Sequence, residues 1–223
     1  MIYGSAGTYV LPIAIEKFAG ASELIEICSY RKRILPSPEG IESAVYGGMR
    51  ELDFGTFEKA TELSVFTPKP GLEFLVAAPL FLGKSAVEHY VREQVIDRRD
   101  VLDYTSIAIE LGVLDSDSAS EFLATKYCVP GGVELGIFPK SWITLQLSKM
   151  ELIGRRFLCL HGDRVRKYKM RKVRTVAFLA ECLGSFLLLG HLKEQYSNNI
   201  PADIFGYLIV GVEGNSRYSL GVG

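Results

Sequence analysis

The amino-acid sequence predicts an α+β fold: a mostly antiparallel sheet interrupted by a three-helix insertion near residues 85–127. Apolar and polar residues alternate near both ends of the chain, as they do in half-buried strands. Between these regions, the helical part (about 84–128) repeats its apolar residues with the 3.6-residue period of helices. β-type patterns then return over residues 131–223. Strands and helices do not alternate, so we expect one α+β domain over residues 1–223 rather than a parallel sheet.

The predicted N-terminal part is a hairpin followed by a short helix. Tyr9, Leu11, Ile13 and Ile15 alternate with smaller or polar residues, which predicts a strand. Residues 24–30 offer a second strand to complete the hairpin, although a helix is also compatible with them. One short helix is expected within 39–66, before a Pro- and Gly-rich break at 67–71.

The helical insertion follows an almost continuous apolar run at 72–82 that suits a buried strand. Helical periods cover 85–97 and 100–114, and a third helix is expected to start at Ser118, with Glu121 completing a capping box. The loop before it resembles the start of a calcium loop. We exclude calcium, because Ser120 and Lys126 occupy the positions that need Gly and Glu.

The C-terminal part is predicted to be a β-meander. Its strands are expected at residues 133–137, 143–148, 157–160, from 165 onward, and in a last hairpin of 205–212 with 217–222. The turn between the third and fourth of these strands would be His161-Gly162-Asp163.

Charge is strongly uneven along the chain. The 223 residues carry a net charge of −1, yet seven of the 25 Lys and Arg residues lie in residues 164–174, here called the basic stretch. The other 18 basic residues stand against 26 acidic ones, so the rest of the chain carries about −8. On a strand, the basic stretch would be cationic on both sides, as in an edge or a projecting ribbon.

Such a ribbon can neutralise phosphates, and Tyr168 could stack on a base. The alternatives are a solvated edge or salt bridges to the acidic remainder. The candidate nucleic-acid-binding residues are Arg164, Arg166, Lys167, Tyr168, Lys169, Arg171, Lys172 and Arg174.

An apolar run at residues 176–189 follows the basic stretch directly. It has 14 residues with Glu181 in the middle, whereas a bilayer needs roughly 20 apolar residues, so we expect a buried element and no transmembrane segment. Four widely spaced cysteines are typical of reduced thiols. No basic region precedes the first apolar stretch, so we expect no secretory signal and a cytoplasmic protein.

Two further patterns could carry chemistry. Ala78–Ser85 fits a permissive phosphate-loop spelling in which Lys84 would contact phosphates and Ser85 would hold Mg²⁺. Its Pro-Leu-Phe-Leu interior leaves little room for close phosphate approach, and a strand break before a helix is the simpler interpretation. Cys159, His161 and Asp163 would share one face of a strand. We favour a strand that ends in a polar turn over a nucleophile–base pair or a metal site.

These observations favour a non-enzymatic binding or assembly protein. Its expected partners are RNA or another nucleic acid, or an anionic membrane surface, contacted through the basic stretch. Mean hydropathy of +0.18 and glycine-rich strands favour self-association into a homo-oligomer. Nucleocapsid, matrix and RNA-silencing proteins are examples of this class, and no cofactor, metal or catalytic residue is expected. The alternative is a degenerate phosphate-loop nucleotide-binding enzyme that uses Lys84 and Ser85.

Overall fold

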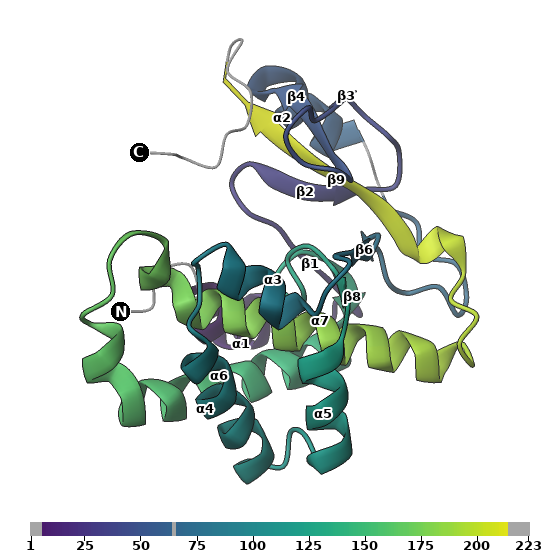
Figure 1. Cartoon of the computed structure of the whole chain (residues 1–223). Helices are drawn as coiled ribbons and strands as arrows, with labels where there is room; N and C mark the ends of the chain where they lie inside the picture. The colour runs from purple at the N-terminus through teal and green to yellow at the C-terminus, as the bar shows by residue number, and fades with distance from the viewer. Residues whose placement is uncertain (1–5, 64–65, 214–223) are drawn as a thin grey trace.

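The chain folds into a sheet and a larger helical part that lies against it in a computed structural model (Figure 1). The structure describes residues 6–63 and 66–213. Helices and strands are mixed along the chain, with antiparallel and mixed sheets. The predicted α+β class is therefore confirmed, although several of its elements are not where the sequence pattern placed them.

The largest sheet is built around one strand, β9 (Phe205–Val212). It pairs antiparallel with β2 (Lys32–Leu35) and parallel with both β4 (Met49–Asp53) and β5 (Val76–Ala77). The short β3 (Ile41–Glu42) extends the sheet beyond β4. The middle of β9 is buried on both faces, since Leu208, Ile209 and Val210 are buried, whereas Tyr207 near its start is 42 % exposed. This sheet is thus mixed, but antiparallel pairs outnumber parallel ones among the described strands, as the sequence predicted.

Two antiparallel strand pairs complete the β structure. β1 (Leu24–Ile27) pairs with β8 (Gly136–Pro139), and β6 (Leu80–Phe81) pairs with β7 (Tyr127–Cys128). The strand expected within 24–30 is confirmed, but its partner is β8. The strands expected at 72–82 and 133–137 are shortened to β5, β6 and β8.

The predicted N-terminal hairpin is wrong, because residues 6–18 form the helix α1 (Ala6–Phe18). Thr8, Tyr9 and Ile15 are buried, whereas Ile13 is 63 % exposed, so burial does not follow the alternation of the sequence. The helix packs along α6, which supplies the apolar partner that a strand would have found in a sheet.

The three-helix insertion is confirmed as α3 (Ala86–Arg92), α4 (Arg98–Glu110) and α5 (Ser116–Ala124). The N-cap of α5 is Asp115 rather than Ser118: the Asp115 carboxylate accepts the Ser118 N–H at 2.7 Å, and the Ser118 hydroxyl accepts the Asp115 N–H at 2.9 Å. The short helix expected within 39–66 is α2 (Phe54–Leu63).

The predicted C-terminal meander is wrong over residues 140–195. That region forms α6 (Lys140–Val165), a 3₁₀ helix at Met170–Arg174 and α7 (Thr175–Gln195). Leu145 is 54 % exposed, so the alternation over 143–148 does not describe burial. The fully buried α6 residues recur every three or four positions, as in a helix: Ile143, Leu147, Met150, Ile153 and Phe157.

The last predicted hairpin is confirmed only for its first strand, which is β9. Its expected partner at residues 217–222 lies outside the residues that the structure describes.

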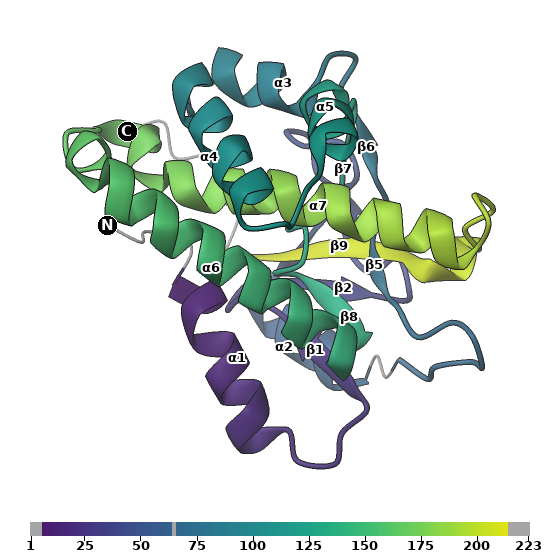
Figure 2. The ribbon, with the colours of Figure 1, turned by 90° about the horizontal axis from the view of Figure 1, so that it is seen from below.

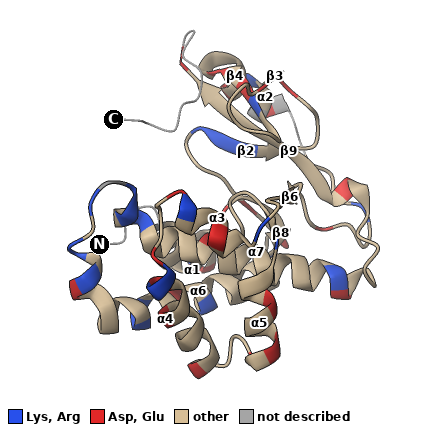
Figure 3. Cartoon of the chain, in the orientation of Figure 1, with Lys and Arg blue, Asp and Glu red and all other residues tan. Residues whose placement is uncertain are grey.

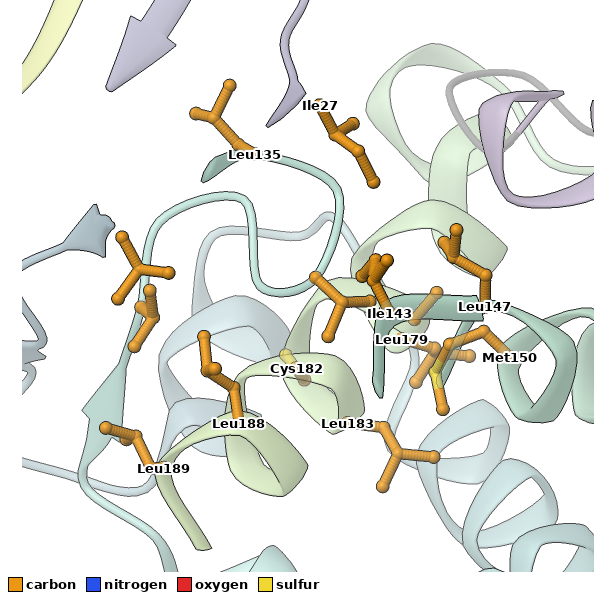
Figure 4. Packing of buried hydrophobic residues seen from close by; sticks show 14 of the residues in the cluster. Ile27, Leu135, Ile143, Leu147, Met150, Leu179, Cys182, Leu183, Leu188 and Leu189 are labelled. Carbon is orange, nitrogen blue, oxygen red and sulfur yellow. The ribbon is translucent and has the colours of Figure 1, made fainter. Parts of the chain in front are cut away.

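α6 and α7 run side by side in opposite directions beneath the sheet (Figure 2). α7 is surrounded by other elements, and its residues Leu179, Leu183 and Leu188 belong to the same buried cluster as Ile143 and Leu147 of α6 (Figure 4). By length and composition, Arg171–Gln195 could cross a membrane, but 67 % of its most apolar window is buried in the fold. A core helix has the same properties, so this is weak evidence for a membrane span.

Candidate active site

The basic stretch connects α6 to α7 and is not a strand (Figure 3). Arg164 lies in the last turn of α6. The 3₁₀ helix Met170–Arg174 contains Arg171, Lys172 and Arg174. Several side chains of the basic stretch form ion pairs with acids of α4 or with Asp97, the N-cap residue of α4. These acids are more than 60 residues away in the sequence. This arrangement corresponds to the internal salt-bridge alternative, not to a projecting ribbon.

Asp100 is the centre of this network and has no exposed surface. Its Oδ1 lies 2.6 Å from Nη2 of Arg164, and its Oδ2 accepts hydrogen bonds from the hydroxyls of Tyr168 at 2.8 Å and Thr175 at 3.3 Å. The same Arg164 nitrogen lies 2.6 Å from Oδ2 of Asp103. Burial and the bond to Asp100 raise the pKa of Tyr168. Arg164 and Tyr168 are therefore structural.

The remaining basic residues are divided between internal pairs and the surface. Lys172 pairs with Asp97, and Arg166 lies 2.7 Å from Asp163. The guanidinium of Arg174 lies 5.2 Å from the ring centroid of Phe178. Two of these residues, Arg171 and Lys172, are partly buried. The exposed ones are Arg166, Lys167, Lys169 and Arg174.

The phosphate-loop candidate lacks the geometry of a phosphate loop. Its interior is occupied by the two-residue strand β6, which pairs antiparallel with β7, whereas a phosphate loop keeps that interior free to wrap the phosphates. Gly83 makes a left-handed turn at φ +71°, and the Ser85 hydroxyl accepts the Glu88 N–H at 3.1 Å as the N-cap of the seven-residue α3. Lys84 and Ser85 thus begin a short helix.

Cys159, His161 and Asp163 lie within α6, where residues two apart point in different directions. His161 Nε2 instead faces Oδ2 of Asp103 at 3.7 Å. Among residues 6–63 and 66–213, no group of three or more His, Cys, Asp or Glu side chains has the arrangement of a metal site.

The structure brings together a pair of partly buried acids that the sequence did not predict. Glu134 follows the turn at Pro130-Gly131-Gly132, and Glu181 lies in the middle of α7. We call Glu134 and Glu181 the acid pair. They come together because the loop at residues 129–135 docks directly on α7.

Four polar and steric contacts fix this docking. The Val129 N–H donates to Oγ of Ser185 at 2.7 Å, and the Gly131 N–H donates to Oε1 of Glu181 at 2.9 Å. A Cβ at Gly132 would lie 2.8 Å from the backbone oxygen of Glu181, and one at Gly184 would lie 3.0 Å from Cγ2 of Val133. Glycine is therefore required at position 132, where φ is also +54°, while a side chain at position 184 would crowd Val133.

Burial raises the pKa of the Glu134 carboxyl to about 7. The hydroxyl of Thr8, on α1, donates to this carboxylate, which lowers the pKa, while the Glu181 carboxylate raises it and Arg174 lowers it. Glu134 remains partly exposed, so a ligand can reach it. A half-buried carboxyl that titrates near neutrality is typical of catalytic acids and bases.

Glu181 has a different environment. Burial raises its pKa, whereas the Gly131 N–H and the positive charges of Lys32 and Arg174 lower it. Lys32 comes from β2 and Arg174 from the residue before α7, so cations from two elements surround the acid pair.

Two thiols and a phenol line the same region. Cys128 Sγ lies 3.8 Å from the hydroxyl of Tyr90, and burial raises the pKa of Cys128 to about 11. Burial also raises the pKa of Cys182 well above its usual value. These thiols stay protonated at neutral pH, whereas the Glu134 carboxyl titrates near neutrality.

A signal for one member of the acid pair was present in the sequence. Glu181 interrupts the apolar run at 176–189, and an acid on a core helix needs either a partner or a function. On sequence grounds alone, Glu181 argues only against a membrane span. Glu134 carries no comparable signal, because its importance arises from the docking of its loop.

Comparison with known proteins shows a shared fold. No family model matches the sequence, and no curated protein matches it. Among solved structures, the chain is similar to the apo structure of the bifunctional glycosyltransferase WbbM, with a TM-score of 0.69 and 14 % identity. The match covers 92 % of this chain and 36 % of that chain, so this chain spans about a third of the length of WbbM. At this identity the likeness shows the fold alone.

The prediction of a non-enzymatic protein that contacts RNA or another nucleic acid through the basic stretch is wrong. The fold is shared with an enzyme, and nothing in the comparisons supports an RNA-binding or viral structural protein. The structural reason for the error is that Arg164 and Lys172 face Asp100 and Asp97 within the fold.

Proposed function

We propose that the chain catalyses glycosyl transfer from a nucleotide-activated sugar to an acceptor hydroxyl, with Glu134 as the general base. The observation that carries the proposal is the partly exposed Glu134 carboxyl with a pKa of about 7, beside a second acid, Glu181, and two cations. The fold shared with a glycosyltransferase supports the same class of reaction.

The reaction needs a proton acceptor at one position. The acceptor oxygen attacks the anomeric carbon of the donor, the bond from that carbon to the diphosphate oxygen breaks, and the diphosphate leaves with the electron pair. Glu134 takes the proton of the acceptor hydroxyl. A base with a pKa near the working pH combines a useful ionised fraction with sufficient basicity.

Glu181 acts as a positioning residue. Its carboxylate holds the Gly131 N–H, so it fixes the loop that presents Glu134, and its negative charge contributes to the raised pKa of Glu134. Lys32 and Arg174 supply positive charge near the acid pair, which favours an anionic diphosphate leaving group.

The test is a transfer assay that measures the nucleoside diphosphate released from a panel of nucleotide sugars, each with simple glycoside acceptors. Glu134→Gln is expected to lower kcat by about 10²–10⁴-fold, the usual contribution of a general base. Wild-type kcat/KM should fall as the pH drops below about 7, because the base becomes protonated. Glu110→Gln is the matched control, since Glu110 is a surface residue of α4 that pairs with Arg156.

Two results would contradict the proposal. One is release of nucleoside diphosphate at the wild-type rate by a folded Glu134→Gln variant. The other is the absence of release from every nucleotide sugar in the panel, with no change in Tm on adding uridine, guanosine or thymidine diphosphate. A diphosphate that binds the folded state must raise its stability.

A further inference from the structure

A second site lies at the other end of β8, where the strand leads into α6 beside the C-terminal half of α7 (Figure 2). It is an open pocket of about 430 Å³, lined by residues that precede β5, by the first turns of α6 and by the end of α7. His191 follows Glu181 by ten residues on α7, which corresponds to about 15 Å along the helix axis. The pocket is thus separate from the acid pair.

Aromatic rings form the wall of this pocket. The rings of Trp142 and His191 stack with centroids 5.2 Å apart and an interplanar angle of 28°. Phe74 meets Trp142 edge-on at 5.3 Å, and Phe138 stacks with Trp142 at 5.7 Å. Because Phe74 and Phe138 are buried, they hold Trp142 in place from below. The wall is rigid and pre-formed, as in small-molecule sites.

Polar groups surround the aromatic wall without being used by the fold. Within the described part of the chain, the indole N–H of Trp142, the ring nitrogens of His191 and the carboxylate of Glu73 have no hydrogen-bond partner. The amide of Gln195 reaches only the neighbouring Tyr196 hydroxyl at 3.3 Å. Burial lowers the pKa of His191, so its ring is neutral near pH 7 and offers one donor and one acceptor.

We propose that this pocket binds one ring of a neutral saccharide, with Trp142 and His191 against the apolar face of the sugar and Glu73 and Gln195 on its hydroxyls. The lining residues include an acid and no Lys or Arg, which disfavours nucleotides and other phosphate-bearing ligands. The mixture of an aromatic wall and several hydroxyl-matching groups suits a polyhydroxylated ring better than an apolar chain. This site is additional to the proposed transfer site, and its test needs no donor sugar or turnover.

The chain contains a single tryptophan, and it lies in this pocket. Intrinsic tryptophan fluorescence therefore reports on Trp142 alone. The experiment titrates wild-type protein with methyl glycosides of hexoses and N-acetylhexosamines and with their disaccharides. At least one of them is expected to give a saturable change in emission. Glu73→Gln and Gln195→Ala should each weaken its binding about tenfold, the effect of losing one hydrogen bond of about 1.4 kcal/mol.

Lys193→Gln is the matched control, because Lys193 is exposed near the end of α7 and does not line the pocket. The affinity of this control variant for the saccharide should equal that of the wild type. For Trp142→Phe, ligand-observed NMR replaces fluorescence and should show weakened binding, while circular dichroism checks the fold.

Three results would overturn the proposal. The first is an emission unchanged by every saccharide at tens of millimolar. The second is a saturable response to uridine or adenosine with none to saccharides. The third is unchanged saccharide affinity in both pocket variants. Because no transfer is measured, these results are independent of the outcome at Glu134.

Discussion

Nη2 of Arg164 lies 2.6 Å from Oδ1 of Asp100, an aspartate with no exposed surface. The two residues are 64 positions apart, and their pairing joins the end of α6 to the first turn of α4. A charge that seemed available for a polyanion is therefore the counter-ion of a buried acid.

Arg164→Ala is expected to lower the free energy of unfolding by about 3–5 kcal/mol, because it leaves Asp100 buried without its cation. Arg166→Ala is the control: its partner Asp163 is 90 % exposed, and the change should be within about 0.5 kcal/mol. Urea unfolding measures both. Equal effects would mean that Asp100 is satisfied by Tyr168 and Thr175 alone.

Glu134→Gln should stabilise the protein at alkaline pH. The pKa of Glu134 is raised in the folded state, so its contribution to stability is fully present below the unfolded pKa near 4.5 and is lost as the pH rises through about 7. Glutamine avoids that loss, and the gain should reach about 3 kcal/mol at pH 8, fall below about 1 kcal/mol at pH 5 and vanish only below about pH 4. Unfolding measured at pH 8 and at pH 5 checks this. A gain that is the same at both would show that ionisation of Glu134 is not its cause.

Gly132→Ala should disturb the docking of the 129–135 loop on α7. Gly132 has φ +54°, and an added Cβ would lie 2.8 Å from the backbone oxygen of Glu181. Gly112 has φ +67° with nothing within 4 Å, so Gly112→Ala measures the conformational strain alone, about 1–2 kcal/mol. The Gly132 variant should lose more than this and should also lose transfer activity. Equal losses in thermal unfolding would show that the loop has room to move.

Leu188→Asp should abolish soluble folding, because Leu188 has no exposed surface and an unpaired carboxylate in the core is very costly. Leu160→Asp, on the outer face of α6, should fold, since Leu160 is 50 % exposed. Leu187 is only partly buried, so Leu187→Asp should be intermediate. Size-exclusion chromatography with circular dichroism distinguishes these outcomes, and a folded Leu188→Asp monomer would contradict the described core.

The helical insertion could be predicted because its apolar period extends over whole helices. The strand prediction at the start of α6 rests on only six residues, 143–148, a window in which a helix and a strand give similar patterns. Ile143 and Leu147 are four apart, a spacing that satisfies both a period of 2 and a period of 3.6. Met150, three positions after Leu147, continues the helical spacing and leaves the strand spacing, so a longer window separates the two.

The candidate site could not be predicted for a different reason. A local count of charge found no acid near Lys172, but its partner Asp97 is 75 residues away. Likewise, the environment of Glu134 is created by Thr8, Glu181 and Arg174, which only the fold brings together. Pairings across such separations leave no local pattern in one sequence.

The place of β9 in the sheet has a consequence for the order of events during synthesis. β2, β4 and β5 all depend on β9 as their common neighbour, yet residues 205–212 leave the ribosome after all of them and after both long helices. Until then the three strands present unpaired edges, and closing the sheet spans most of the chain. The helical part can assemble during translation, whereas the sheet must wait for its last strand and needs protection from aggregation in the interval.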